Sequence, residues 1–136
     1  MATLRLEIVT PEEMTYSEDV DMVELPGIDG ELGILPFHVP LMTQLRPGEL
    51  HVKKGLEDIW LAVGQGFVEV GPDHVSVLTD MAVEEKKIDE AAAQEAIDRA
   101  QKAMSEANLN DEEVAAVEAT IQRSLAQINV KRRRRG

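Results

Sequence analysis

The chain has 136 residues, of which 43% are hydrophobic, so it is long enough for one globular domain or for a small domain with an appendage. It contains no cysteine, which excludes disulfides and thiol catalysis. The formal net charge is −12, yet five of the 14 Lys and Arg residues stand together at positions 131–135, after all 26 acidic residues. An acidic body of this kind does not bind nucleic acid or anionic lipid through a broad surface, so only this basic tail, residues 131–135, has the charge for such a contact.

Short apolar runs with a period of two occupy the first 85 residues, and turn signals such as Pro26-Gly27 and Pro47-Gly48 separate them at intervals of roughly ten residues. No helix-length pattern lies between the runs, which disfavours a parallel sheet with crossover helices. The pattern therefore predicts an α+β chain that begins with an antiparallel β-sandwich over residues 1–85. The predicted strands are centred on residues 4–8, 23–25, 50–52, 59–63, 67–70 and 75–78.

No segment of the sequence has the hydropathy of a membrane span. The first residues alternate between apolar and polar side chains and are too polar for a signal peptide. The longest plain apolar run, Ile59 to Val63, is far shorter than a membrane span. We therefore expect any membrane association to come through a partner, and a bacterial or plastid-encoded origin.

Residues 30–40, GELGILPFHVP, combine two glycines, two prolines and four aliphatic residues. Pro36 and Pro40 exclude a continuous central strand here. The ordinary interpretation is a loop folded into the edge of the sandwich, but so many apolar groups in a loop also suggest a docking surface. A second glycine-rich stretch, residues 64–66, lies between two strand runs and predicts a bend or bulge.

Residues 86–136 contain no proline and no glycine before Gly136, and they predict a helical hairpin. Asp89 is placed to cap the first helix, and Asn110 with Glu113 forms a capping-box pattern before the second. The expected packing stripes are Ala92, Ala96, Ala100, Ala103 and Ala107 in the first helix, and Val114, Val117, Ile121, Leu125 and Ile128 in the second. Because an alanine stripe buries little apolar area, we expect a small free-energy gap to hold the hairpin in place.

The sequence offers no constellation for catalysis, metal binding or a cofactor. None of the three histidines has a second ligand at metal spacing, and we interpret all three as surface or structural residues. There is no nucleophile elbow and no phosphate-binding loop. The chain is therefore predicted to be a non-enzymatic interaction protein.

Four segments in register resemble the epsilon subunit of F-type ATP synthase: residues 30–41 (GELGILPFHVPL) with Pro47-Gly48 after them, residues 66–70 (GFVEV), residues 75–80 (VSVLTD), and Ile88-Asp89. The resemblance covers nearly the whole chain. It implies a sandwich of about ten strands with a C-terminal hairpin. It also implies a rotor subunit of the central stalk that performs no bond chemistry, couples rotation, and restrains ATP hydrolysis through its hairpin.

The same resemblance implies partners and a location. The partners are the gamma subunit, the ring of c subunits, and the beta (and alpha) subunits of the catalytic head, with no nucleic acid. The expected location is peripheral, on the cytoplasmic or stromal face of an energy-transducing membrane.

Carried over by position, the resemblance implies three groups of contact residues. The c-ring contact consists of Gly27, Asp29, Gly30, Glu31, Leu32 and Gly33. The gamma contact consists of His38, Pro40, Leu41, Met42, Leu78 and Asp80. The inhibitory tail, which would meet an acidic segment of the beta subunits, consists of Arg123, Lys131, Arg132, Arg133, Arg134 and Arg135.

Many bacterial members of the resembled family bind ATP at the start of the first helix, and this chain departs from them there. Ile88, Asp89 and Arg99 match the expected positions, but Ala92 stands where an arginine is expected. Alanine cannot donate a hydrogen bond to a phosphate. We therefore expect weak or absent ATP binding.

Two alternatives stay open. One is a generic sandwich-plus-hairpin adaptor outside any ATP synthase, and copurification with gamma would separate it from a rotor subunit. The other is a small nucleic-acid-binding protein that uses the basic tail, which the acidic body and the scarcity of aromatic residues for stacking argue against. The tail itself has a plainer interpretation, a frayed terminus that aids solubility, beside that of an electrostatic contact with an acidic partner.

Overall fold

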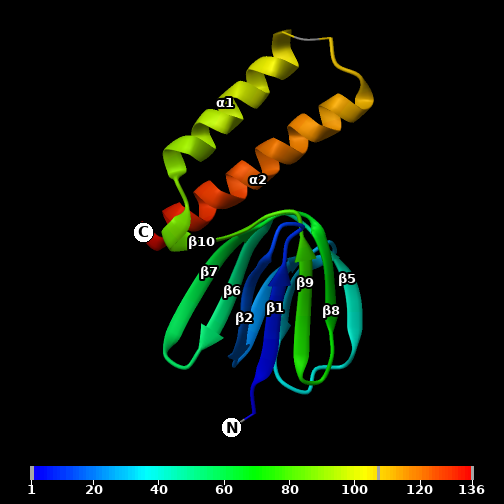
Figure 1. Ribbon diagram of the computed structural model, residues 1–136, viewed down its shortest axis with the longest axis vertical. Coiled ribbons are helices and arrows are strands. Elements are labelled where there is room, and N and C mark those ends of the chain that lie inside the picture. The colour runs from blue at the N-terminus through cyan, green and yellow to red at the C-terminus, as the bar shows by residue number, and fades with distance from the viewer. Residues whose placement is uncertain (1, 107, 136) are drawn as a thin grey trace.

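The computed structural model describes residues 2–106 and 108–135, with the side chains of residues 15, 134 and 135 left out. A β-sandwich is followed by a helical hairpin that stands on one end of it (Figure 1). The strands are β1 (Leu4–Val9), β2 (Met14–Val20), β3 (Met22–Gly27), β4 (Gly30–Ile34), β5 (Leu41–Leu45), β6 (Gly48–Lys54), β7 (Glu57–Val63), β8 (Gly66–Val70), β9 (His74–Thr79) and β10 (Ala82–Glu84). A 3₁₀ turn, η1 (Glu85–Lys87), leads into the helices α1 (Glu90–Glu106) and α2 (Asp111–Arg135).

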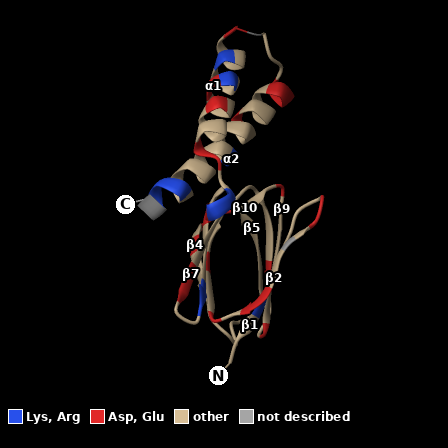
Figure 2. Ribbon diagram, turned by 60° about the vertical axis from the view of Figure 1, so that its left-hand side comes forward, with Lys and Arg blue, Asp and Glu red and all other residues tan. Residues whose placement is uncertain are grey.

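The ten strands form one sheet, in the order β10-β7-β6-β3-β5-β8-β9-β1-β2, with β4 paired to β3. The sheet folds into two layers, with β4 and β7 in one and β1 and β2 in the other (Figure 2). A single bridge, Gly27 with Leu45, joins β3 to β5. The predicted antiparallel sandwich is confirmed, except that β1 runs parallel to β9 because the first strand enters between β9 and β2.

The core between the layers is built from Leu, Ile and Val, because the chain has few aromatic residues. Leu6 and Ile8 of β1 are completely buried, while Glu7 between them points outward, as the period of two requires. Tyr16 is the aromatic residue of this core, and burial raises the pKa of its hydroxyl well above the usual value. Each strand therefore turns one row of side chains inward and leaves the other row for different contacts.

Four strands lie where the apolar pattern was too weak to predict them, namely β2, β4, β5 and β10. In residues 30–40 the first half is strand β4, paired with β3, and only the second half is the expected loop. The loop carries Phe37 with a φ of 69°, and β5 begins directly after Pro40, so the prolines do stop strand pairing as expected.

Both predicted helix caps are present. The backbone N–H of Ala92 donates to Asp89 Oδ1 at 3.1 Å. The N–H of Glu113 donates to Asn110 Oδ1 at 2.8 Å, and the N–H of Asn110 donates to Glu113 Oε1 at 3.3 Å, which completes a reciprocal capping box.

The predicted packing stripe of the first helix is confirmed at Ala100, which is buried, but it is wrong at its start. Ala92 is exposed, and the buried residues of α1 are Ala93, Ile97 and Ala100. Ala93 and Ile97 pack with Ile128 of α2, whereas Leu125 is 38% exposed. Helical spacing alone does not fix which face meets the partner helix, and Ala107 of the expected stripe lies outside the described residues.

Gly66, the first residue of β8, lies close to the backbone of β9. A Cβ at Gly66 would lie 1.8 Å from the carbonyl oxygen of Leu78 in β9. We therefore expect Gly66→Ala to destabilise the chain by about 2 kcal/mol or more, since the backbone of one strand must move. Chemical denaturation followed by circular dichroism measures the change. Gly33→Ala is the matched control, because nothing lies within 4 Å of a Cβ there, and an equal loss in both variants would contradict the explanation.

Candidate functional site

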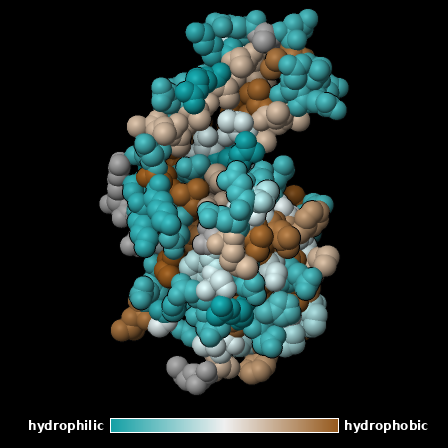
Figure 3. Space-filling model, viewed as in Figure 1, coloured by the Kyte–Doolittle hydropathy of each residue, from teal (hydrophilic) through white to brown (hydrophobic). Residues whose placement is uncertain are grey.

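An exposed apolar face covers the outer side of β5, β8 and β9. Met42 is 69% exposed, Phe67 54% and Leu78 53%. Phe67 of β8 lies opposite Leu78 of β9 in the strand register, while their neighbours Val68 and Val77 point into the core. Figure 3 shows hydrophobic side chains on the surface over this part of the sandwich. Large apolar groups held outward by a rigid sheet are typical of a docking surface, and we call Met42, Phe67 and Leu78 the apolar face.

The loop before β5 extends this surface at its other end. Leu35, Phe37 and Val39 are 59%, 77% and 74% exposed. The N–H of Phe37 donates to the carbonyl oxygen of Pro72 at 2.6 Å, which holds the loop beside the β8–β9 turn. The imidazole of His38 lies 2.7 Å from the carbonyl oxygen of Val39, so it shapes the loop.

The structure separates the residues that the sequence grouped as one gamma contact. Met42 and Leu78 belong to the apolar face, and Pro40 is exposed in the adjoining loop. Leu41, in contrast, packs against the core. Phe67 belongs to the apolar face although the sequence did not single it out, and the alternation of buried Val68 and Val70 was the signal that placed it outward.

Asp80 faces the hairpin. Its Oδ2 accepts a hydrogen bond from Nη1 of Arg123 in α2 at 3.2 Å. A Cβ at Gly64 would lie 1.8 Å from Asp80 Oδ1, so the carboxylate lies directly over this glycine. The bend predicted at residues 64–66 thus makes room for a contact between the sandwich and α2.

The residues predicted to meet the c ring form the β3–β4 turn and the first part of β4. Gly27 pairs with Gly30, whose φ of 133° favours glycine, and Ile28 and Asp29 stand exposed at the tip of the turn. Glu31 is exposed, whereas Leu32 packs against the core. The turn therefore presents one apolar and two acidic side chains, together with glycine backbone.

The C-terminal half of α2 lies on the outer side of β6 and β7 (Figure 1). Ala126 and Val130 pack with Ala62 of β7 and with Ile88. Ile88, which the sequence grouped with a nucleotide site, is therefore part of this packing. In Figure 2 the basic end of α2 lies at the side of the sandwich that carries β7.

The basic tail is bound within the chain. Lys131 pairs with Glu85 at 3.7 Å, and Arg132 Nε with Glu90 at 2.9 Å. Arg133 pairs with Glu49, whose carboxylate raises the pKa of the guanidinium. The side chains of Arg134 and Arg135 lie outside the described residues. A partner that needs Lys131, Arg132 or Arg133 must therefore exchange with carboxylates that already hold them.

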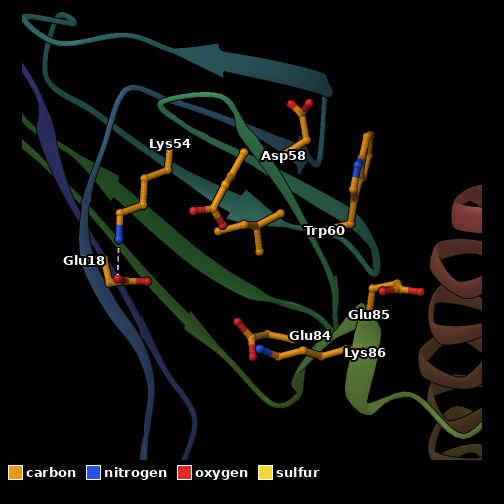
Figure 4. Close-up of a pocket in the computed structure, with 9 residues that line it drawn as sticks. Glu18, Lys54, Asp58, Trp60, Glu84, Glu85 and Lys86 are labelled. Carbon is orange, nitrogen blue, oxygen red and sulfur yellow. Dashed lines mark hydrogen bonds and ion pairs between the residues drawn. The ribbon is translucent and has the colours of Figure 1, made fainter.

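A cleft of 430 Å³ is lined by side chains of β2, β6, β7, β10 and η1 (Figure 4). Lys54 donates to Glu18 across it, and this hydrogen bond lowers the pKa of the Glu18 carboxyl. The other lining residues are Glu57, Asp58, Ile59, Trp60, Glu84, Glu85 and Lys86. Within residues 2–106 and 108–135, no His, Asp and Glu side chains are grouped to hold a metal ion.

The residues of the predicted nucleotide site have other partners or lie apart. Asp89 caps α1 through the N–H of Ala92, and Ile88 packs with Ala126 and Val130. Arg99 is exposed beside a shallow depression between the helices, which is lined by the small side chains of Ala96, Ala100 and Ala116.

Both parts of the chain match models of one protein family. A family model described as the ATP synthase delta/epsilon chain β-sandwich domain matches residues 3–85. The long α-helix domain of the same family matches residues 86–132. The ATP synthase epsilon chain of Dehalococcoides mccartyi strain BAV1 is 46% identical over 135 residues, 99% of this chain and 96% of that one. The epsilon chain of Herpetosiphon aurantiacus is 41% identical over 97% of this chain and 96% of its own length.

Solved structures agree with the sequence relatives. A chain of the Euglena gracilis mitochondrial ATP synthase, in a structure of its OSCP, F1 and c-ring, has a TM-score of 0.73 at 25% identity, over 90% of this chain and 77% of that one. A chain from the central stalk and c-ring of the Tetrahymena thermophila enzyme shares the fold, with a TM-score of 0.59 at 14% identity over 98% and 96% of the two chains. The chain belongs to the family of ATP synthase epsilon chains. None of the helices among the described residues is long and apolar enough to cross a membrane.

From the geometry at the start of α1 we predict that the isolated chain binds ATP weakly or not at all, with a Kd above about 1 mM. Asp89 is occupied as a cap, and Ala92 has no donor for a phosphate. Calorimetric titration with MgATP measures the affinity, and a submillimolar Kd would contradict the prediction. Ala92→Arg supplies the guanidinium that is missing, so tighter binding by that variant would assign the weakness to this one position.

Proposed function

We propose that this chain is a non-catalytic rotor subunit of the central stalk of an F-type ATP synthase. It couples rotation between the c ring and the catalytic head during ATP synthesis. The observation that carries the proposal is the apolar face of Met42, Phe67 and Leu78, exposed on a rigid sandwich in a chain whose relatives are epsilon chains.

The gamma subunit is the proposed partner of the apolar face, with His38 and Pro40 in the loop beside it. The β3–β4 turn, with Asp29 and Glu31, is the proposed contact with the polar loops of the c ring. These two surfaces use different parts of the sandwich, so one subunit can bind both partners at once. The similar Euglena chain comes from a structure that contains F1 and the c-ring, which supports an assembly of this kind.

The hairpin is the proposed regulatory part. In the extended state, Arg123 and the basic tail would reach an acidic segment of the beta (and alpha) subunits and restrain ATP hydrolysis. Through gamma and the ring the chain would lie peripherally on the cytoplasmic or stromal face of the membrane. The nucleic-acid alternative is weakened because Lys131, Arg132 and Arg133 already pair with carboxylates of the same chain.

Leu78→Ser is expected to weaken binding to gamma at least about tenfold, because it puts a polar group into the apolar face. Coexpression of the chain with gamma tests whether the two proteins copurify. Surface plasmon resonance with purified gamma measures the affinity of each variant. Phe67→Ser should have the same effect.

Leu56→Ser is the matched control, since Leu56 is an exposed leucine in the β6–β7 turn, away from the apolar face. If the wild-type chain fails to copurify with gamma, the generic adaptor becomes the better description. If Leu56→Ser weakens binding as much as Leu78→Ser, the apolar face is not the contact.

Removal of residues 131–135 is expected to raise ATP hydrolysis by the assembled head, because the extended hairpin loses its cations. The restraint by the intact chain should also fall as salt is added, since ion pairs at an exposed contact are screened. Steady-state ATPase assays with and without the deletion measure both effects. Unchanged activity after the deletion would remove the tail from the mechanism.

A further inference from the structure

Trp60 forms one side of a preformed site on the outer side of β6 and β7. It lies opposite His51 in the strand register, and the two rings stack with centroids 4.3 Å apart and planes 14° apart. The ring nitrogens of His51 lie 2.8 Å from Glu24 Oε1 and 2.7 Å from Asp58 Oδ1. The two carboxylates fix the imidazole, which in turn stacks on the indole of Trp60.

Arg133 also lies over the Trp60 ring. Its guanidinium carbon lies 4.6 Å from the centroid of the Trp60 ring. Nε of the same side chain donates to Glu49 Oε2 at 3.0 Å, and Nη2 donates to the same oxygen. A flat cation that stacks on an aromatic ring and donates sideways to a carboxylate is what a guanidinium can provide and an ammonium cannot.

The contacts along this face of α2 are small apolar side chains and partly exposed ion pairs, and the Arg133 side chain itself is 51% exposed. Arg123, Ala126, Val130 and Arg133 follow one another at spacings of three or four residues, so they share the face that meets the sandwich. Val130 is the only completely buried side chain among these four, and the pairs of Arg123 and Lys131 are partly exposed to solvent. Arg133 is the last of this series and combines an aromatic contact with an ion pair.

We infer that Trp60, His51 and Glu49 form a binding site for one guanidinium group, and that its occupation by Arg133 keeps the hairpin docked on the sandwich. With the site empty, the packing of Ala126 and Val130 and the partly exposed pairs of Arg123 and Lys131 hold α2 too weakly to keep it against β6 and β7. The site belongs to the isolated chain, so it can be tested without any partner and independently of the proposed function.

Trp60 is the only tryptophan of the chain, so its fluorescence reports on this site directly. The test compares wild type with Arg133→Ala, Arg133→Lys and Arg132→Ala. The last is the matched control, because Arg132 pairs with Glu90 of α1 and not with the sandwich. Iodide quenching of the Trp60 emission measures access to the ring, and hydrogen exchange of amides 124–130 measures the docking of α2.

Arg133→Ala is expected to raise iodide quenching and to speed exchange of amides 124–130 at least about tenfold. Arg133→Lys should resemble Arg133→Ala, because an ammonium loses the stacked geometry. Arg132→Ala should behave as wild type. Exchange of the amides of β1, β8 and β9 should stay unchanged in every variant, which separates undocking from loss of the fold.

Three results would overturn the inference. Wild-type quenching and exchange in Arg133→Ala would show that the site does not hold the hairpin. An equal effect of Arg132→Ala would show that only total charge matters. Full docking of Arg133→Lys would show that the site does not select a guanidinium.

Discussion

The alternation of side chains between the core and the outer face of each strand is the constraint on which the rest of this structure depends. Each strand turns one row of aliphatic side chains into the core, so the other row is fixed in place on the outside. In β8, Val68 faces inward and Phe67 therefore faces outward. In β7, Leu61 faces inward, so Trp60 and Ala62 face outward beneath α2. A shift of one residue in either strand would exchange these roles.

The two outer faces of the sandwich have different uses as a result. The face on β6 and β7 is covered by the chain's own helix, through small side chains and ion pairs. The face on β5, β8 and β9 carries three large apolar side chains that no other part of the described chain covers. A sandwich of this design can keep one face bound to a partner while the helix on the other face changes its position.

The helix is held by several modest contributions. Burial of an aliphatic side chain contributes about 0.8 kcal/mol per CH₂, and Ala126 offers little of it. Partly exposed ion pairs such as Arg123 with Asp80 contribute about 0–1 kcal/mol each. A cation against an indole contributes about 0.5–2 kcal/mol, depending on its exposure. Because no single contribution is large, a partner that offers comparable contacts can shift the equilibrium between docked and undocked helices.

The sequence alone predicted those features of the structure that depend on residues close together in the chain. The caps at Asp89 and Asn110 depend on residues three positions apart, and the stop between β4 and β5 depends on Pro36 and Pro40. The phase of α1 could not be predicted, because it depends on which face meets Ile128. Nor could the docking of the tail, because Arg133 and Glu49 are 84 residues apart. The resemblance to epsilon subunits agreed with the fold that the residue pattern predicted, and the predicted gamma contact of Leu41 and Asp80 stays a prediction, with Leu41 packed against the core and Asp80 paired with Arg123.

The basic tail has a role in the docked hairpin and a second, proposed role in the extended hairpin. A substitution is informative about one role only if it leaves the other unchanged. In the docked state Arg133 neutralises Glu49, and in the proposed extended state the same arginine would face an acidic partner. Removing the arginine weakens both states, and the expected rise in ATP hydrolysis follows because the extended state, which restrains hydrolysis, loses the larger contribution. Glu49 takes part in the docked state alone. A change at Glu49 shifts the equilibrium toward the extended hairpin while the tail keeps its charge. Substitution of Glu49, and not of Arg133, can therefore separate the docking of α2 from the proposed restraint of ATP hydrolysis.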